Sequence, residues 1–399
     1  MSELVLRSAD VVGGGAPFAL RIEFEVAADV VFDVDVSLDL RRADGSLAHH
    51  AQLRAAGWDP SWLPRGRYAC HVLSPSAPPA GGTLELGLWH HVANEAHCTA
   101  RANVAVAGGG GDGAWPLSWQ LESAAGTTPI AQLSWKRGAH DWFHKHFDHA
   151  ARTVMSYMLG DSPLLRGRVL DVGCGDGITD LGIALRLAPQ RFVGVDPFRG
   201  YERLPQILRD AHLPLAQLPD YIEFMPADAN ALPFEDDSFD VVLSWGSLEH
   251  IAGGHAQAFA EIRRVLRRDG LLFVHPGLYY SDLGHHLGEF DFAQREPYVH
   301  LKHPREELRE MVLNGTPQRM DRAGDIATPA QYWQWFCELN PITVPGFEAE
   351  LRALDFEPWR VALRTHDRVD YTAELQPYSF VDLASAELYV SAYNRKPAR

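Results

Sequence analysis

Three glycines in five positions stand at the centre of residues 167–187, GRVLDVGCGDGITDLGIALRL. The stretch begins as a buried strand and ends with the spacing of a helix, so Gly173, Gly175 and Gly177 form the turn between them. Without Cβ atoms, such a turn can lie close against a ligand, and in open α/β sheets it sits at the edge where ligands bind. The pattern predicts a ligand site, although helix–strand packing would also account for a glycine turn.

Acidic side chains end the next two apolar runs. Asp196 closes RFVGVD, about 20 residues after the glycines, where an acidic residue meets ribose hydroxyls. Asp228 closes the following run, in MPADANALPF, and could accept a hydrogen bond from an adenine amino group. A fourth run, FDVVLSW, continues into GSLEHI. The carboxyl ends of these runs should meet at one sheet edge, which indicates a nucleoside site.

Histidines supply candidates for a general base near neutral pH. His250 follows the fourth run and His275 ends the fifth, LLFVHPG, so both are expected at the same edge. Alternatively, Glu249 and His250 only cap and pack the next helix. His286 belongs to an insertion after the fifth run and is expected, with its neighbours His285, His300 and His303, to line a lid.

The histidine-rich stretches also contain residue types that can bind a metal. His285, His286, Glu289 and Asp291 are suitable ligand types, yet adjacent histidines on one short segment cannot easily share an ion. His140, His144, His146 and His149 lie on a predicted helix over residues 140–158. A polar helix face over the cofactor entrance is the preferred interpretation there. We expect no functional metal.

Composition restricts the remaining classes of function. The 399 residues carry a formal charge of −16, so nucleic acid and anionic membranes would be repelled. The start of the chain has no signal-peptide pattern, and no apolar run approaches the ~20 residues of a membrane span. The four cysteines are scattered without pairing motifs. These features predict a cytoplasmic protein that does not insert into membranes.

The chain reads as two unlike halves. Residues 1–106 alternate polar and apolar side chains between turn clusters, which predicts a β-sandwich. Residues 107–139 include a glycine-rich linker, and in residues 140–399 strands alternate with helices, which predicts a mostly parallel sheet covered on both faces. An insertion around 276–345 should form a cap over the acceptor. The aromatic runs late in the chain build the core of that cap or line an acceptor pocket.

The motifs VLDVGCGDG, GVD, DANALPFEDDSFDVVLSWGSLEHI and EIRRVLRRDGLLFV resemble, in order and spacing, a class I S-adenosylmethionine-dependent methyltransferase of type 11. The resemblance covers residues 140–280 and implies a Rossmann-like sheet with S-adenosylmethionine as cofactor. It implies the cofactor-binding residues Asp171, Gly173, Cys174, Gly175, Gly177, Asp196, Asp228, Ala229, Ser244 and Trp245. The spacing GxGxG, with no Walker lysine, counts against a nicotinamide dinucleotide or a nucleoside triphosphate.

The first half loosely resembles, in strand rhythm and turns, the glycan-binding sandwich of polysaccharide-export ATPases. That resemblance implies docking on a saccharide chain or a glycan-assembly partner. Trp58, Trp62 and Trp89 are candidate stacking platforms, although core packing explains any single one better. The competing interpretation is a structural or dimerising domain. We therefore expect an O-methyltransferase acting on a saccharide or glycan precursor. The alternatives are methylation of a small natural product or amine, and a non-catalytic scaffold that keeps the fold.

Overall fold

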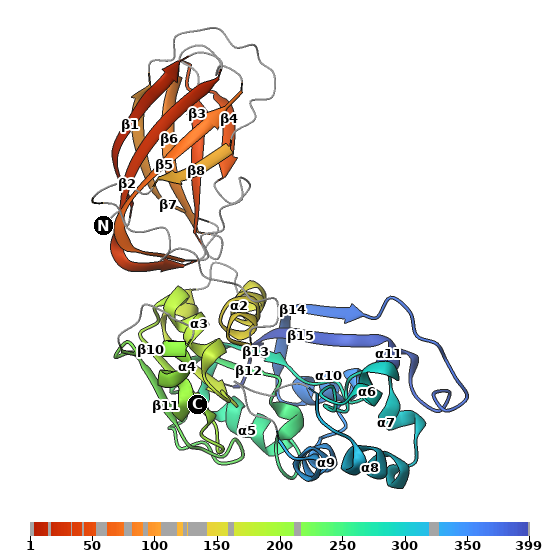
Figure 1. The fold of residues 1–399 in the computed structure, drawn as a ribbon. Helices are drawn as coiled ribbons and strands as arrows, with labels where there is room; N and C mark the ends of the chain where they lie inside the picture. Colours follow the sequence, from red (N-terminus) through yellow and green to blue (C-terminus); the bar gives the residue numbers. More distant parts are fainter. Residues whose placement is uncertain are drawn as a thin grey trace. The chain divides into compact units, whose positions relative to one another are not determined.

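The computed structural model describes residues 4–14, 17–32, 34–41, 44–52, 62–75, 82–90, 95–104, 118–122, 126, 142–158, 163–210, 217–318 and 327–397. The chain divides into two compact units, residues 1–138 and 139–399 (Figure 1). None of the described helices is long and apolar enough to cross a membrane.

Two four-stranded antiparallel sheets make up the first unit. Their orders are β1-β2-β5-β8 and β4-β3-β6-β7, and β1 contacts β7 of the other sheet. The strands are β1 Leu4–Gly14, β2 Phe18–Phe32, β3 Val34–Arg41, β4 Leu47–Gln52, β5 Trp62–Ser74, β6 Gly82–His90, β7 Glu95–Val104 and β8 Ser118–Glu122. Because β8 pairs with β5, the end predicted for this domain at residue 106 was too early, and the predicted linker contains a strand.

A seven-stranded sheet of order β11-β10-β9-β12-β13-β15-β14 forms the centre of the second unit. The strands are β9 Arg168–Val172, β10 Arg191–Val195, β11 Ile222–Met225, β12 Phe239–Trp245, β13 Leu266–His275, β14 Phe356–Thr365 and β15 Ser385–Asn394. Strand β15 runs antiparallel to both of its neighbours, β13 and β14, and the other strand pairs of this sheet are parallel. This arrangement confirms the predicted Rossmann-like methyltransferase sheet. Strand β14 was not predicted, because its FEPWRV was interpreted as part of the cap.

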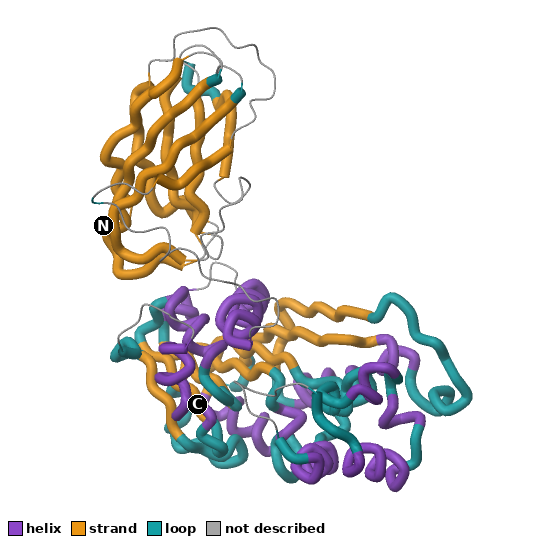
Figure 2. The backbone as a smooth tube through the Cα atoms, viewed as in Figure 1, coloured by secondary structure: helices purple, strands orange, loops and turns teal. Residues whose placement is uncertain are grey.

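Helices cover both faces of this sheet (Figure 2). They are α1 Trp142–His144, η3 Lys145–Ala150, α2 Ala151–Met158, η4 Pro163–Arg166, α3 Ile178–Leu187, η5 Gly200–Arg203, α4 Leu204–Asp210, η6 Leu248–His250, α5 Ala256–Val265, α6 Asp291–Arg295, α7 Val299–Lys302, α8 Arg305–Asn314, α9 Pro329–Glu338, α10 Val344–Ala353 and α11 Phe380–Ala384. On one face α5 and α10 share a core with the sheet through Phe259 and Phe347. On the other face α3 packs closely against the sheet. A Cβ added to Gly194 of β10 would lie 2.5 Å from a carboxylate oxygen of Asp180 in α3.

The order in which the chain adds strands to the sheet reverses between β9 and β12. The chain passes from β9 to β10 and β11 on one side, and β12 lies against the other side of β9. In open α/β sheets, ligands bind in the crevice at such a point, outside the carboxyl ends of the strands. The fold therefore places the glycine turn after β9 and the segment GSLEHI after β12 at one crevice.

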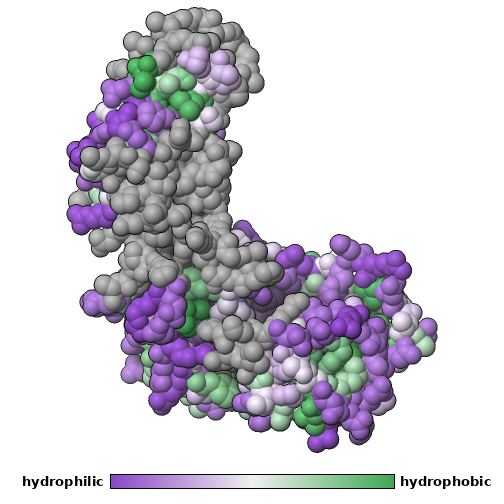
Figure 3. Space-filling view, viewed as in Figure 1, coloured by the Kyte–Doolittle hydropathy of each residue, from purple (hydrophilic) through white to green (hydrophobic). Residues whose placement is uncertain are grey.

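Two segments that are separate in sequence contribute to the cap. Helices α6, α8 and α9 pack around Phe290, Tyr332 and Phe336, and a second cluster joins Tyr298 to Leu375 and Leu383, which lie between β14 and β15. The predicted insertion at 276–345 is therefore only part of the cap. The aromatic run QYWQWFCEL places Tyr332 and Phe336 in its core, which supports the structural interpretation of that run. On the face in Figure 3, the outer surface of this unit is mainly hydrophilic, with apolar side chains in small groups.

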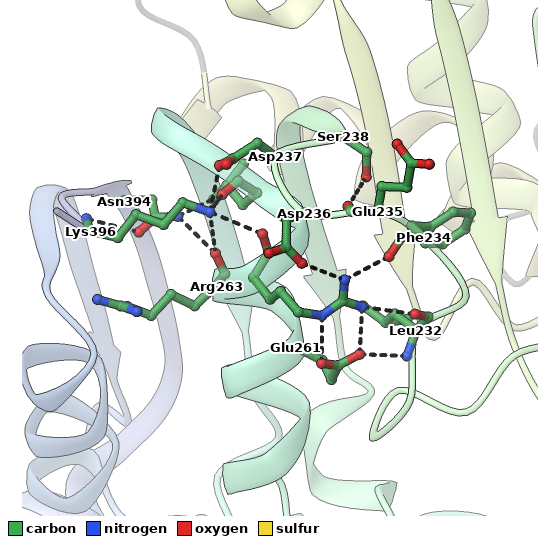
Figure 4. Close-up of polar contacts among 12 residues, drawn as sticks. Leu232, Phe234, Glu235, Asp236, Asp237, Ser238, Glu261, Arg263, Asn394 and Lys396 are labelled. Atoms are coloured by element: carbon green, nitrogen blue, oxygen red, sulfur yellow. Dashed lines mark hydrogen bonds and ion pairs between the residues drawn. The ribbon is translucent and has the colours of Figure 1, made fainter. Parts of the chain in front are cut away.

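A polar network fixes the C-terminal segment after β15 against the end of α5 (Figure 4). The Lys396 ammonium donates to the carbonyls of Arg263 and Arg264 at 3.0 Å and of Leu266 at 2.6 Å, and it pairs with Asp237. Helix C-termini leave such carbonyls without intrahelical partners. One buried lysine thus binds the free carbonyls at the C-terminal end of α5 and links this end to the loop that precedes β12.

Replacing Lys396 with Met should lower the free energy of unfolding of the second unit by about 1–3 kcal/mol, because the carbonyls at the end of α5 lose their charged donor. Urea unfolding followed by helical circular dichroism measures this unit, since all described helices belong to it. The control is Arg368→Met, whose side chain is 80% exposed and should change the free energy little. Equal shifts in the two variants would contradict the role assigned to Lys396.

Candidate functional site

The glycines of the turn serve different purposes. Gly175 has φ +56°, and a Cβ on it would meet nothing within 4 Å, so its open side faces the crevice. Gly177 has φ +76°, and a Cβ there would lie 2.8 Å from the Phe224 ring of β11. Gly175 and Gly173 line the crevice, whereas Gly177 does not. Gly177, predicted to bind the cofactor, is therefore a packing residue that lets α3 start close to the sheet.

A cavity of about 1020 Å³ occupies this crevice. Its wall is formed by the chain that follows β9, β10, β11, β12 and β13, together with residues of α1, η3, β14 and β15. Ligand pockets usually measure about 300–1,000 Å³, so this one has room for two small molecules side by side. The predicted residues on its wall are Asp171, Gly173, Cys174, Gly175, Asp196, Asp228, Ala229, Trp245, His250, His275 and His286.

The carboxylates after β10 and β11 are held by backbone amides. Asp196 accepts hydrogen bonds from the N–H groups of Gly175 at 3.1 Å and Phe198 at 2.8 Å. Asp228 accepts one from Asn230 at 2.9 Å. These bonds fix both carboxylates at the strand ends. The bond from Gly175 also joins the end of β10 to the glycine turn. Asp196 and the turn, which were both predicted to contact the ligand, are therefore held next to each other.

A pair of buried carboxyl groups lies beneath the turn. Burial raises the pKa of Asp171 to about 7, with a further increase from the negative charge of Asp196. Burial, followed by the charge of Asp171, raises the pKa of Asp180 well above its usual value. The Asp180 carboxyl therefore favours its protonated form beside Asp171. The Oδ1 atom of Asp171 is buried without a hydrogen-bond partner among the described residues, so it remains available to a donor in the cavity.

The predicted residues at the end of β12 have different positions. Ser244 is fully buried, and its hydroxyl donates to the Val172 carbonyl at 2.8 Å. It does not line the cavity, which corrects its predicted role; Ser247, which sequence reasoning missed, does. The Ser247 hydroxyl donates to the Gly173 carbonyl at 2.8 Å. Serine side chains thus join the two strand ends, and Trp245 lines the crevice between them.

His275 lines the cavity but is strongly constrained. Its Nδ1 donates to the Leu388 carbonyl at 2.9 Å, and its ring stacks on Tyr389 at 4.5 Å and lies 4.4 Å from the Trp245 ring. Burial lowers the pKa of His275, so the ring is neutral at physiological pH. Of its two ring nitrogens, only Nε2 remains available for chemistry.

Glu249, His250 and His286 form the most polar part of the wall. The Glu249 side chain is 3% exposed, and its Oε1 lies 3.9 Å from Nε2 of His250 and 3.8 Å from Nε2 of His286. Burial raises the pKa of Glu249, but the charges of His250 and His286 and the N–H of Gly277 outweigh burial and hold that pKa below its usual value. The carboxylate is therefore ionised, and two imidazoles lie against it.

The other histidines are not brought to the cavity wall. His285 is fully buried in the cap, and His300 donates through Nε2 to the Tyr279 carbonyl at 2.6 Å. Burial lowers the pKa of both, to about 4 for His300. His303 pairs with Glu296 and Glu307. Of these four histidines, His286 alone lines the cavity, and the structure does not bring His285, Glu289 and Asp291 together as a group of metal ligands.

The first helical segment reaches the cavity through His146, which the sequence analysis named, and through Trp142 and Lys145, which it did not. Trp142, Lys145 and His146 line it, and the Trp142 indole donates to Asp176 at 2.8 Å. The polar character of this helix was the signal in the sequence, and it predicted a face over the entrance. His140 lies outside the described residues, and nothing is described of the His144 side chain.

Comparison with known proteins agrees with this geometry. Residues 170–274 match a family described as a methyltransferase domain. A phthiotriol/phenolphthiotriol dimycocerosates methyltransferase from Mycobacterium ulcerans is 37% identical over 116 residues, which cover 29% of this chain and 37% of that protein. A ubiquinone biosynthesis O-methyltransferase from Azorhizobium caulinodans is 28% identical over 55% of this chain and 74% of its own length. The chain thus spans about a third of the first relative.

A solved geranyl diphosphate methyltransferase, in complex with GPP and sinefungin, has a TM-score of 0.38 and 14% identity over 62% of this chain and 77% of its own. The methyltransferase match lies wholly within the second unit and covers the glycine turn, both strand-end carboxylates and Glu249–His250.

The Asp171–Asp180 pair should make stability depend on pH. In the unfolded chain both groups lose their protons near pH 4, whereas the folded protein keeps them toward pH 7, so the free energy of unfolding should fall as pH rises from about 4 to about 7. Asp180→Asn provides a permanent donor and should make that decline shallower in urea unfolding between about pH 4 and pH 8. The exposed control Asp291→Asn should keep the wild-type slope. Identical slopes in all three proteins would exclude the pair as the cause.

Proposed function

We propose, because residues 170–274 carry a methyltransferase domain, that this protein transfers a methyl group from S-adenosylmethionine to a hydroxyl oxygen. One observation carries the proposal. A single cavity joins the glycine turn and its carboxylates to a cluster of one carboxylate and two imidazoles. A cofactor at the first end would place its reacting group beside an acceptor at the second, and holding two reactants together is a large part of such catalysis.

The first end fits the cofactor chemically. Gly175 leaves open space against the backbone, and the unpartnered Oδ1 of Asp171 suits an ammonium group. Asp196 and Asp228 stand where ribose hydroxyls and an adenine amino group would be bound. Four of the acidic side chains on the wall, Asp171, Asp176, Asp196 and Asp228, belong to this end and favour a positively charged ligand, and S-adenosylmethionine carries both a sulfonium and an ammonium.

The cofactor supplies a methyl group on sulfur: the acceptor oxygen forms the new C–O bond with its lone pair, the C–S bond breaks, and sulfur keeps that electron pair as a thioether. The hydroxyl proton must leave. We assign its removal to the cluster of Glu249, His250 and His286, either by direct acceptance on a histidine, as predicted for His250 and His286, or by ionisation of the acceptor on a bound cation. We assign His275 to positioning Trp245 at the crevice, because a backbone carbonyl holds its Nδ1 and its ring lies against the Trp245 ring.

We propose a saccharide or glycan precursor as the acceptor. Polar side chains from Ser281, Asp282 and Glu387 add hydrogen-bonding groups to the wall of the cavity, which suits a hydroxyl-rich molecule. A small natural product or an amine is the alternative: the name of one relative, 27-O-demethylrifamycin SV methyltransferase of Amycolatopsis mediterranei, places such a product among the substrates of similar proteins. We assign the first unit to glycan docking or to self-association. Of its proposed stacking residues, Trp58 lies outside the described residues, and nothing is described of the side chains of Trp62 and Trp89.

We place the protein in the cytoplasm, because Cys70, Cys174 and Cys337 are free thiols. The competing class, a scaffold without chemistry, has no need for a cavity of this size or for an ionised carboxylate buried at its acceptor end.

Replacing Asp196 with Ala should weaken binding of S-adenosylhomocysteine at least tenfold, because a charged hydrogen-bond acceptor contributes about 1.5–3 kcal/mol. Isothermal titration calorimetry measures the affinity, and the exposed Asp291→Ala is the matched control. Unchanged affinity in Asp196→Ala would remove that residue from the cofactor site, and failure of the wild-type protein to bind would overturn the proposed cofactor.

Mass spectrometry of products from a panel of glycans and hydroxylated metabolites tests the acceptor. Addition of one methyl group to a saccharide hydroxyl is the expected result. Methylation of amines alone would refute the O-methylation proposal, and tight cofactor binding without any product across the panel would favour the scaffold.

A further inference from the structure

Three metal-ligand side chains from two segments meet at the acceptor end of the cavity. Glu249 and His250 belong to η6 after β12, and His286 follows β13. One ligand atom of each lies within 4.8 Å of the other two, and within the part of the chain that the structure describes this is the one group of three or more His, Cys, Asp or Glu side chains so placed. We propose that Glu249, His250 and His286 bind a divalent transition-metal cation that holds an acceptor with two neighbouring oxygens.

The carboxylate of Glu249 is fixed for this role. Its Oε2 accepts the N–H of Gly277 at 2.9 Å, and a Cβ on Gly277 would lie only 2.5 Å from Oε1, so glycine is required for the carboxylate to reach this position. Oε1 then faces the two imidazoles at 3.8 and 3.9 Å, which is too long for hydrogen bonds. Metal–ligand bonds of about 2.0–2.2 Å to a shared cation would span this gap after small side-chain rotations.

The backbone directs His286 toward the cluster. Its φ is +52°, a region that residues other than glycine rarely adopt, and its N–H donates to the Leu283 carbonyl at 3.1 Å. Strained backbone of this kind persists where the surrounding structure requires it, commonly at functional sites. The His286 ring meets the His250 ring edge to face at 4.7 Å. Both rings are about one-third exposed or less, so the cluster opens into the cavity and is not sealed in the core.

The donor set indicates which cations fit. Two imidazole nitrogens and one carboxylate oxygen on one side of an ion leave positions open for other ligands, an arrangement typical of sites for Fe²⁺ and similar metals. Mg²⁺ prefers oxygen ligands, so Mn²⁺, Fe²⁺, Co²⁺ or Zn²⁺ suits this site better. The cation would also offset the buried negative charge of Glu249.

The acceptor class follows if the proposed function holds, since this part of the inference rests on it. Two open positions beside the cofactor end select a molecule with adjacent oxygens, such as a vicinal diol of a sugar or a catechol. The cation lowers the pKa of the hydroxyl that it binds, and the proton leaves to solvent before the C–O bond forms. The two imidazoles then bind the cation and do not accept the proton. An amine acceptor would have no use for this site.

Binding of Mn²⁺ tests the site without any assay of activity. Full-length protein is treated with a chelator, exchanged into metal-free buffer and titrated with Mn²⁺, and the free ion is followed by electron paramagnetic resonance. We expect one Mn²⁺ per chain, with affinity at least tenfold weaker in His286→Ala and in Glu249→Gln, because each variant removes a ligand. The control His303→Ala removes a histidine that also lies between carboxylates, and it should bind Mn²⁺ like the wild type.

Binding of S-adenosylhomocysteine to each variant serves as the folding check. If folded wild-type protein binds no Mn²⁺, or if folded His286→Ala binds it with wild-type affinity, the metal site is refuted and the proposed methyl transfer stands. If Mn²⁺ binds as expected but S-adenosylhomocysteine does not, the proposed function fails and the metal site remains.

Catechol and phenol test the acceptor class by calorimetry on the protein with S-adenosylhomocysteine. Mn²⁺ should tighten the binding of catechol at least tenfold and leave that of phenol unchanged. Equal effects of Mn²⁺ on the two probes would overturn the inference that the cation binds two neighbouring oxygens.

Discussion

Hydrogen bonds from two serine hydroxyls hold together the strand ends on which the whole site depends. Ser244 binds the Val172 carbonyl and Ser247 binds the Gly173 carbonyl, so the ends of β9 and β12 are fixed side by side. The chain leaves these parallel strands in opposite directions, and therefore no connection fills the crevice between them. The positions of the cavity, the glycine turn and the Glu249 cluster all depend on this contact between the ends of β9 and β12.

Charge divides the cavity into two ends. Carboxylates from three neighbouring strand ends surround the glycine turn, and one of them, Asp171, lies beside Asp180 of α3, whose pKa burial raises well above its usual value. At the other end a single buried carboxylate, Glu249, is balanced by imidazoles. A cationic donor suits the first environment and a hydroxyl acceptor suits the second. The distribution of charge, more than the shape of the cavity, therefore distinguishes its two ends.

The cap shows how aromatic residues serve the site indirectly. Tyr332 and Phe336 pack in its interior, and a second cluster joins Tyr298 to Leu375 from the segment between β14 and β15. Because the cap is anchored by both segments, the residues that follow β13 are held over the crevice. His286 is brought to the wall in this way, while its sequence neighbour His285 points into the cap and is fully buried.

The sequence by itself determined the parallel sheet, the glycine turn and the carboxylates of Asp196 and Asp228, because apolar runs and turn residues act through neighbours close in the chain. It could not separate Gly175 from Gly177, or Ser244 from Ser247, since those differences depend on contacts with Phe224 and with the carbonyls at and just after the end of β9. The front unit's boundary and strand β14 were missed for the same reason: β8 and β14 are strands only because distant partners pair with them. Only the tertiary structure brought His286 to Glu249 and His250, since residues more than thirty positions apart meet when the sheet and cap pack, and no local pattern records that meeting.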